Sequence, residues 1–408
     1  MQGASEAPDR SAAEERLQGL LVEHRERFVA RFGGGGDARL FLSPGRVNLM
    51  GAHLDYNGGP VMPMAIDRGT FLAARARQDD RVRIASTLDD TVLELTLGEI
   101  EGSDPTVRGA WVDYPLGVVL DLVRSGCTTS GADLWIGGNL PIGAGLSSSA
   151  SVCVGTAYAL TTLWGVAAEP KGLIDAALWA EREFVGVQCG IMDPYAVTLA
   201  RPGHLLWLDC FDQSYEHVPL DQGAVTIAVA DTGVRRELAQ GAFNERVAQC
   251  ASAFEKLQPL QDGARCLAQI TRETLDRGAG ALEDAERKRA EHVIGETARA
   301  HDARHALREG DLARFGRNMS AAHESLREHY EVSIPELDTL VEAALAWDGV
   351  LGTRLTGAGF GGCIVVALAT EARQGFAEHL GEAYRQKFGP VPHVEFFQGG
   401  SGPREFPL

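Results

Sequence analysis

The chain has 408 residues, of which 45% are hydrophobic and 23% are charged. This composition is that of a globular protein, and it excludes a disordered chain, a collagen and a small disulfide framework. The 38 basic and 56 acidic side chains leave a net charge of −18, which argues against a protein that holds nucleic acid through its own field. A small anionic ligand stays compatible with this charge if backbone N–H groups and a metal ion receive it.

Targeting signals and cysteine usage favour a cytoplasmic protein that does not bind a membrane. No apolar run approaches the roughly 18 residues that a membrane span needs. The first residues, MQGASEAPDRSAAEER, lack the basic start and apolar centre of a signal peptide. The seven cysteines are scattered and never spaced as C-x-x-C, which favours a reducing compartment over disulfides or a zinc site.

The hydrophobic patterns predict an α+β chain in two lobes, about 12–215 and 216–408. In the first half, helices are predicted at 12–32, 111–123, 148–164 and 171–185, and strands at 38–43, 61–67, 70–77, 81–86, 91–97, 132–138 and 204–210. In the second half, strands are predicted at 225–233, 353–356, 363–369 and 393–398, long charged helices within 240–330, and further helices at 335–346 and 371–387.

A Gly- and Ser-rich segment, PIGAGLSSSAS, occupies residues 141–151 between a predicted strand and a helix of small residues. Glycines at 143 and 145 let the backbone approach a ligand, and the free N–H groups of a helix start favour a phosphate. Its three consecutive serines add donors and a candidate ligand for a hard metal ion. The segment is not a Walker A loop. Taken alone, it is equally well explained as a glycine turn before a serine-capped helix.

Two further segments are rich in glycine or in polar side chains. LTGAGFGGC (355–363) leads into a buried strand, so its glycines imply tight turns or close contact with a ligand. SPGRVNLMGAHLDYNGG (43–59) places Arg46, His53 and Asp55 among glycines. So many polar side chains in one short segment suit a pocket for a hydroxyl-rich ligand, because buried hydroxyl groups need hydrogen-bond partners in fixed positions.

In this order and spacing, the three segments resemble the GHMP small-molecule kinases, and specifically their galactokinase branch. The resemblance rests on a sugar-binding signature, GRVNLMGAHLDYNGG (45–59), on the phosphate loop PIGAGLSSSAS, and on the third motif TRLTGAGFGGC (353–363). Further matches are AEREFVGVQCGIMD (180–193), FNERVAQC (243–250) and HESLREHYEVSIPELD (323–338). It implies a two-lobed GHMP kinase fold, with an N-terminal lobe like domain 2 of ribosomal protein S5, a ferredoxin-like C-terminal lobe, and the active site between them.

The resemblance also implies the reaction, which is transfer of the γ-phosphate of MgATP to the anomeric hydroxyl of a monosaccharide. Asp193 matches the acidic residue beside that hydroxyl, and Arg46 matches its partner. Asp55, His53 and Gly190 match the sugar pocket. Mg²⁺ is the implied cofactor, with Glu181 and Ser149 (or one of the two serines before it) as its ligands. The residues implied for ATP are Pro141, Gly143, Gly145, Leu146, Ser147, Ser148, Ser149 and Ala150. We expect a monomer.

The chemistry of these residue types agrees with the implied roles. An anomeric hydroxyl is a poor nucleophile until its proton is accepted, so a positioned carboxylate can act as a general base. Arg46 would keep Asp193 ionised and neutralise charge on the phosphoryl oxygens. From the residues alone, Asp193 is equally a turn or helix-cap residue, Arg46 a surface ion pair and Glu181 a solvated helix residue.

Two positions depart from the galactokinase pattern. The family carries Glu, which holds the C6 hydroxymethyl group of galactose, where this chain has Ala52, and Tyr where it has Phe243. Ala52 removes a charge that would repel a C6 carboxylate, and GAHLD is similar to the motif of galacturonokinases. We therefore expect D-galacturonate as the sugar, with Arg235 and Arg236 as candidate partners of its carboxylate.

Three alternatives stay open. The first is a galactokinase that acts on D-galactose. The second is a non-catalytic sensor of sugar and ATP, which the uninterrupted GLSSSAS and the presence of both Arg46 and Asp193 argue against. The third is a kinase of another small alcohol, such as homoserine or mevalonate, which the DYNGG and CGIMD segments argue against.

Overall fold

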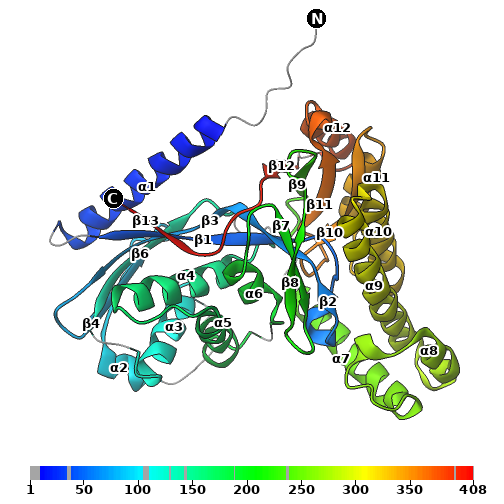
Figure 1. Cartoon of the computed structure of the whole chain (residues 1–408), viewed down its shortest axis with the longest axis horizontal. Helices are drawn as coiled ribbons and strands as arrows, with labels where there is room; N and C mark the ends of the chain where they lie inside the picture. The colour runs from blue at the N-terminus through cyan, green and yellow to red at the C-terminus, as the bar shows by residue number, and fades with distance from the viewer. Residues whose placement is uncertain are drawn as a thin grey trace, which may run out of the picture.

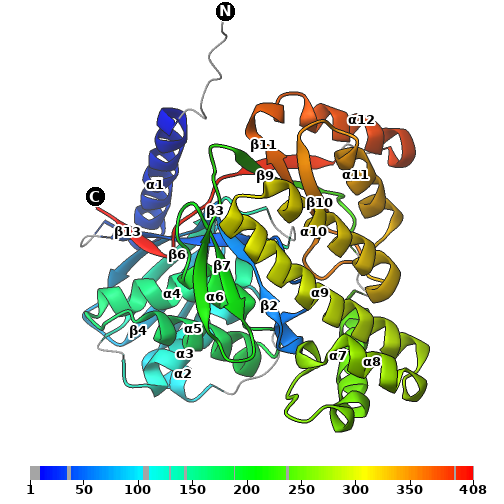
Figure 2. The ribbon, with the colours of Figure 1, turned by 45° about the vertical axis from the view of Figure 1, so that its right-hand side comes forward.

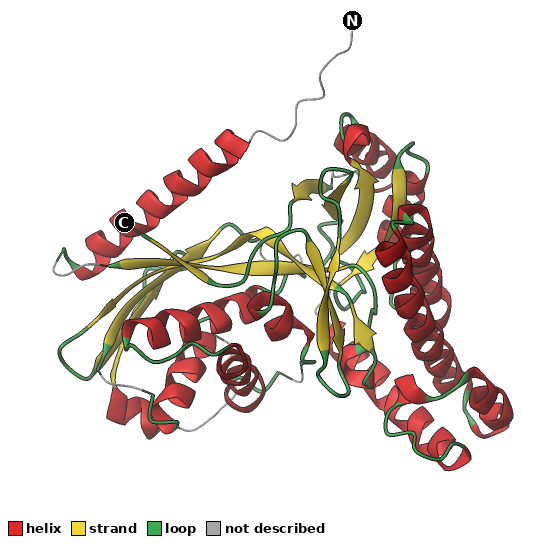
Figure 3. Ribbon diagram, in the orientation of Figure 1, coloured by secondary structure: helices red, strands yellow, loops and turns green. Residues whose placement is uncertain are grey.

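The computed structural model describes residues 10–34, 38–103, 110–127, 130–141, 145–187, 189–235, 239–389 and 392–407. Gly143 and Arg236 lie outside these ranges. Helices and strands are mixed in two lobes (Figures 1 and 3), so the predicted α+β class is confirmed. Among the described residues, no helix is both long enough and apolar enough to cross a bilayer.

The first lobe is built on a six-stranded sheet of order β13-β1-β3-β6-β4-β5. Its strands are β1 (Arg39–Asn48), β3 (Pro63–Ala76), β4 (Arg81–Ser86), β5 (Val92–Thr96), β6 (Ala132–Gly138) and β13 (Arg404–Phe406). Helix α1 (Arg10–Phe32) covers one face, and α3 (Asp113–Arg124), α4 (Ser148–Leu163) and α5 (Pro170–Trp179) lie on the other (Figure 1). The helical face buries a continuous apolar core that includes Leu72, Leu134 and Val154.

Two predicted strands merge into one. Residues 61–67 and 70–77 were expected as separate strands, whereas β3 runs through Gly69. A Cβ atom at Gly69 would lie 2.1 Å from the carbonyl oxygen of Ser43 in the neighbouring strand, so only glycine lets the two backbones pair there. The register of β1 against β3 shifts between Pro44 and Arg46. This irregularity turns the end of β1 toward the second lobe.

The second lobe contains an antiparallel sheet of order β10-β11-β9-β12. Its strands are β9 (Val225–Asp231), β10 (Val350–Thr356), β11 (Cys363–Ala369) and β12 (His393–Phe397). Figure 2 shows its helices, which are α7 (Ala239–Leu257), α8 (Arg272–Gly278), α9 (Asp284–Glu309), α10 (Leu312–Ser325), α11 (Pro335–Leu345) and α12 (Phe376–Phe388). A three-stranded sheet of β2 (Pro60–Val61), β7 (His204–Asp209) and β8 (Tyr215–Pro219) joins the lobes.

Several short elements have no counterpart in the sequence prediction. They are α2 (Leu97–Glu101), α6 (Met192–Thr198), and the strands β2, β8 and β13. A π-helical turn, η2 (Ala180–Phe184), ends the helix that was predicted over 171–185. The last strand, β13, returns from the second half of the chain to pair with β1, with Phe41 opposite Glu405. Residues 404–406 therefore belong to the sheet of the first lobe.

Candidate active site

Arg46 and Asp193 form a bidentate ion pair between β1 and the first turn of α6. The Arg46 Nε and Nη2 atoms each donate to a carboxylate oxygen of Asp193 at 2.7 Å, and Nη1 donates to the carbonyl of Gly145 at 2.5 Å. The Arg46 side chain is only 7% exposed, whereas that of Asp193 is 27% exposed. Arg46 is thus a buried anchor that presents a carboxylate to the cavity between the lobes, and not a surface ion pair.

Ser147 completes this arrangement. Its hydroxyl donates to Asp193 Oδ2 at 2.5 Å, so it does not cap α4, and its backbone has φ of 60°, which is rare for a residue other than glycine. A charge-assisted hydrogen bond offsets this strain. The sequence alone also allowed a helix capped by serine, but the Ser147 side chain does not form that cap.

The described part of the phosphate loop faces the third motif. Ser148 begins α4, and Pro141, Ser149 and Gly145 are partly or fully accessible, whereas Leu146 and Ala150 are buried. A Cβ at Gly145 would lie 3.7 Å from Cα of Gly357, an ordinary contact distance, so the two loops lie side by side, and it is the φ of 69° at residue 145 that favours glycine. The first N–H groups of a helix have no partner inside the helix and favour an anion.

Glu181 lies in the π-helical turn η2 and is 3% exposed. Burial, with the charge of Asp193 adding to it, raises the pKa of Glu181 to about 7, although a hydrogen bond with Ser149 opposes the rise. Cys189 Sγ lies 3.7 Å from Glu181 Oε2. A buried carboxylate beside a serine hydroxyl is an oxygen donor set that suits Mg²⁺, which takes its remaining ligands from water and phosphate. These residues therefore fit the expected metal.

A cavity of about 440 Å³ lies next to this ion pair. Asp55 and Gly190 face each other in its wall, and a Cβ at Gly190 would lie 1.7 Å from Asp55 Oδ2. Burial, and after it the charge of Asp193, raise the pKa of Asp55 to about 6. Two carboxylates, Asp55 and Asp193, thus line one cavity and suit a ligand that carries several hydroxyl groups.

An aromatic wall closes the other side of this cavity. His53 has φ of 60°, its Nδ1 atom lies 2.8 Å from the Tyr56 hydroxyl, and its ring centroid lies 6.0 Å from that of Phe243. Burial lowers the pKa of His53 to about 3, so the ring is neutral. Ala52 also lines the cavity and is held through its backbone, since its N–H donates to Glu296 Oε1 at 3.2 Å.

Arg235, one of the two candidate partners of a substrate carboxylate, is not found in the cavity wall. Arg235 donates to both carboxylate oxygens of Asp231, at 2.9 and 2.5 Å, and is not among the described residues that line the cavity. Arg236 lies outside the described residues. A different arginine, Arg354, lines this cavity together with Asn48.

Sequence reasoning missed Arg354 as a site residue, because a single arginine between Thr353 and Leu355 of a strand gives no signal of its own. Its side chain is 1% exposed, and its Nη2 donates to the carbonyl of Asn48 at 2.6 Å. Its Nε and Nη1 atoms are buried and make no hydrogen bond to the described residues. Its ion pair with Glu296 is 3.8 Å long.

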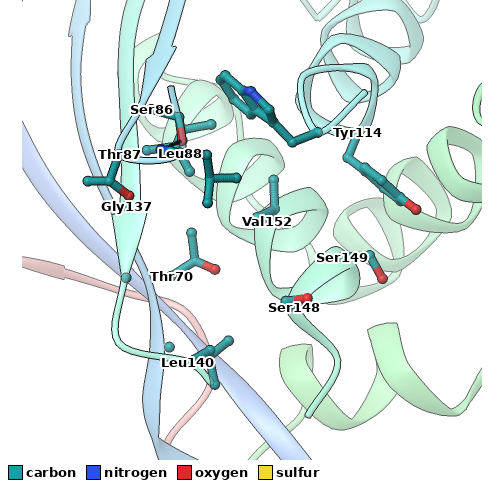
Figure 4. A pocket seen from close by; sticks show the side chains of 14 residues that line it. Thr70, Ser86, Thr87, Leu88, Tyr114, Gly137, Leu140, Ser148, Ser149 and Val152 are labelled. Carbon is teal, nitrogen blue, oxygen red and sulfur yellow. Dashed lines mark hydrogen bonds between the residues drawn. The ribbon is translucent and has the colours of Figure 1, made fainter. Parts of the chain in front are cut away.

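A second cavity, of about 390 Å³, opens at the start of α4 (Figure 4). Ser148 and Ser149 lie at one end, and Thr87, Leu88 and Tyr114 lie around the rest of it. Trp111 also lines it, and its Nε1 donates to Asp89 at 2.7 Å. Sequence reasoning missed this cavity because its walls come from five segments that are separated in the chain. The expected sugar residues thus line the first cavity, and of the expected phosphate residues Ser148 and Ser149 line the second.

Comparisons with known proteins agree with this geometry. Residues 26–76 match the galactokinase galactose-binding signature, residues 113–201 the N-terminal domain of GHMP kinases, and residues 303–386 their C-terminal domain. A galactokinase of Roseiflexus sp. is 42% identical over 381 residues, 93% of this chain and 96% of the relative. A galactokinase of Ligilactobacillus salivarius is 38% identical over 90% of this chain and 95% of the relative.

Among solved structures, a Lactococcus lactis galactokinase complexed with galactose has a TM-score of 0.89 at 34% identity, covering 96% of this chain and all of the other. A mevalonate kinase of Methanococcus jannaschii has a TM-score of 0.68 at 20% identity over 90% of this chain and all of the other, a likeness of fold alone. The resemblance and fold expected from the sequence are confirmed. The chain therefore belongs to the galactokinase family of the GHMP kinases and is a sugar kinase, a phosphotransferase with an alcohol group as acceptor.

Proposed function

We propose that this enzyme transfers the γ-phosphate of ATP to the anomeric hydroxyl of D-galactose. The single observation that carries the proposal is the buried Arg46–Asp193 pair in the wall of the larger cavity, where Asp193 also accepts a hydrogen bond from Ser147, the residue before the serines that line the second cavity. The galactokinase relatives favour galactose over the D-galacturonate expected from Ala52, and none of those reported above supports the acidic sugar. D-galactose is therefore the substrate that we propose.

The two cavities suit two substrates. The cavity beside Trp111 and Leu88 is apolar enough for a nucleotide base, and its end at Ser148 lies at the helix start, where a phosphate is favoured. The cavity beside Asp55 and His53 suits the hydroxyl groups of a sugar. In this arrangement the last phosphate of ATP and the sugar hydroxyl would meet near Asp193.

Asp193 is suited to receive the proton of the sugar. The anomeric oxygen forms a bond to the γ-phosphorus, the bond between that phosphorus and the bridging oxygen of ADP breaks, and the hydroxyl proton passes to Asp193. Arg46 and Ser147 fix both carboxylate oxygens of Asp193, so the carboxylate needs no reorientation during the reaction. The guanidinium of Arg46 would also neutralise charge that develops on the phosphoryl oxygens.

Ser149 and Glu181 are the residues that would hold Mg²⁺. The bound ion would neutralise charge on the phosphate oxygens. Its positive charge would also keep Glu181 ionised, because a nearby cation lowers the pKa that burial has raised. Ser149 lies on α4 and Glu181 lies in η2, and the packing of these two elements fixes the positions of both side chains.

The test is turnover by the purified protein with ATP, Mg²⁺ and D-galactose. We expect ADP release only when the sugar is present, with galactose 1-phosphate as the product, and a loss of kcat of about 10²- to 10⁴-fold in Asp193→Asn. A sensor would bind both ligands without releasing ADP. Wild-type protein that binds galactose and ATP but makes no sugar phosphate would refute the proposal.

A second candidate substrate is D-galacturonate, and Arg354 is the observation that favours it. Burial lowers the pKa of Arg354 to about 10, which means that its charge is poorly compensated. Two of its nitrogens lack hydrogen-bond partners among the described residues, and Ala52, in the same cavity wall, offers no acceptor from its side chain. A substrate carboxylate would supply the missing counter-charge.

The ratio of kcat/KM for galacturonate to that for galactose separates the two candidates. A ratio above one in wild-type protein, and a fall of at least tenfold in Ala52→Glu, would support the acidic sugar, since the new carboxylate would occupy Arg354 and repel the substrate. A ratio far below one in wild-type protein leaves galactose as the substrate.

A further inference from the structure

A continuous chain of hydrogen bonds leads from the sugar cavity into the core of the second lobe. His53 Nδ1 lies 2.8 Å from the Tyr56 hydroxyl, which lies 2.7 Å from the Tyr330 hydroxyl. The Tyr330 hydroxyl lies 3.2 Å from Cys250 Sγ. The four groups come from the loop before β2, from the end of the α10 segment and from α7. None of the roles described so far uses Tyr56, Tyr330 or Cys250.

The far end of this chain is sealed from solvent. Tyr330 is 0% and Cys250 1% exposed, and the His53 side chain is buried as well. His53 Nε2 is buried, makes no hydrogen bond to the described residues, and belongs to a ring that lines the sugar cavity. The order of protons along the chain is therefore set by the protein groups themselves, and it determines whether Nε2 carries a proton.

All four groups are in their neutral forms at neutral pH. Burial raises the pKa of Cys250 to about 11 and raises those of Tyr56 and Tyr330 well above their usual value. The His53 ring, whose pKa burial lowers, carries one proton. Each phenol and the thiol can donate only once. Because a buried phenol hydroxyl without an acceptor is costly, both tyrosines are expected to donate within the chain. Only two proton orders then give every link a donor, one running toward His53 and one running away from it.

The two orders differ in the links at their ends. When the protons point toward His53, the Cys250 thiol donates to Tyr330, Tyr330 donates to Tyr56, and Tyr56 donates to Nδ1. When they point away, Nδ1–H donates to Tyr56 and a phenol donates to sulfur. A phenol is a stronger acid than a neutral imidazole N–H, and an imidazole nitrogen is a better acceptor than a phenol oxygen or a thiol. The order that points toward His53 therefore contains the stronger bonds.

We propose that Tyr56, Tyr330 and Cys250 are positioning residues that fix His53 as the tautomer with its proton on Nε2, so that His53 donates a hydrogen bond to an acceptor atom of the bound sugar. Packing holds the ring in this role. The centroid of Tyr330 lies 4.6 Å from that of His53 and 4.5 Å from that of His292, and Asn57 Nδ2 donates to the His53 carbonyl at 2.7 Å. The hydrogen bond from His53 Nε2 to the sugar depends on the proposed function, whereas the tautomer of His53 does not.

The tautomer can be measured in the sugar-free protein. In wild-type protein labelled with ¹⁵N-histidine, with His53 assigned by comparison with His53→Gln, we expect a protonated Nε2 and an unprotonated Nδ1. In Tyr56→Phe, which removes the hydroxyl that Nδ1 accepts, we expect a mixture of tautomers. Tyr384→Phe is the matched control, because it also removes a buried phenol hydroxyl, one that donates to the Thr232 carbonyl in the second lobe. A protonated Nδ1 in wild-type protein would overturn the proposal.

Steady-state kinetics provide a second test of the proposal. For Tyr56→Phe we expect KM for the sugar to rise about five- to tenfold with kcat changed less than twofold, because the lost tautomer weakens binding without touching Asp193. Tyr384→Phe should leave both constants within twofold of wild type. An unchanged KM in Tyr56→Phe would overturn the proposal. If galactose proves not to be a substrate, the proposed function fails while the measured tautomer still decides this inference.

Discussion

The Oδ2 atom of Asp55 occupies the space that a side chain at residue 190 would fill, since a Cβ at Gly190 would lie 1.7 Å from it. The carboxylate therefore packs directly against the backbone of the segment that leads to Asp193. Because any larger residue must displace Asp55, position 190 controls how the sugar cavity presents its acidic side chain.

Gly190→Ala should weaken sugar binding strongly. Moving Asp55 costs the sugar a charge-assisted hydrogen bond, so we expect KM for galactose to rise at least tenfold while KM for ATP stays within twofold. Gly172→Ala is the matched control, because a Cβ there meets nothing within 4 Å, and its steady-state constants should equal those of wild type. Equal KM values for galactose in the two variants would contradict this account.

Arg46→Lys should disable the site although it keeps the charge. Lysine cannot reproduce the two parallel hydrogen bonds to Asp193, so we expect kcat/KM to fall about 100-fold or more. Arg39→Lys offers a direct comparison, because Arg39 forms a similar bidentate pair with Glu405, at 2.6 and 2.7 Å, far from the cavities. If Arg39→Lys lost as much activity as Arg46→Lys, general destabilisation would explain both.

Glu181 should make the metal-free protein less stable as the pH rises. Its folded pKa of about 7 exceeds the ordinary 4.5, so the folded state binds more protons than the unfolded state between these values, and the free energy of unfolding falls across that window. In EDTA at pH 8, Glu181→Gln should therefore be more stable than wild type, by up to about 3 kcal/mol.

Urea denaturation at pH 4.5 and at pH 8 measures this difference. The two proteins should differ much less at the lower pH, where Glu181 is protonated in the folded state and about half protonated in the unfolded state. Asp55, whose pKa is also raised, is present in both proteins, so its contribution cancels in the comparison. Parallel pH profiles for wild type and Glu181→Gln would show that Glu181 does not carry the effect.

Trp111→Ala should affect the nucleotide and not the sugar. Trp111 lines the cavity at the start of α4, and loss of its ring removes apolar contact area, so we expect KM for ATP to rise about tenfold with KM for galactose within twofold. Trp347, whose Nε1 donates to the Ala372 carbonyl in the second lobe, provides a tryptophan control. Equal rises of KM for ATP in Trp111→Ala and Trp347→Ala would contradict a nucleotide cavity at Trp111.

Much of the fold could be predicted from local sequence. Strands β4 and β6 coincide with the predicted ranges 81–86 and 132–138, because short apolar or alternating runs between turn residues define them. The strands β2, β8 and β13 were not predicted. Each has five residues or fewer, and what makes it a strand is a partner far away in the chain, which no local pattern reveals.

The candidate site could be predicted only where a motif marks it. Arg46, Asp55 and Asp193 stand in segments that resemble known motifs, and the structure brings them to one cavity. The bond from Ser147 to Asp193 and the burial of Arg354 depend on how separate elements pack, so the sequence gives no sign of them. Only the position of Arg235 in the chain supported its assignment as a partner of the substrate carboxylate.

The return of β13 to the edge of β1 ties the last segment of the chain to the strand that carries Arg46. Trimming the protein before Arg404 would remove the Arg39–Glu405 bridge and leave the backbone groups of β1 unpaired along that edge. Shortened forms would thus expose the edge of the first lobe's sheet at Leu40–Leu42, although the missing residues follow the second lobe in sequence.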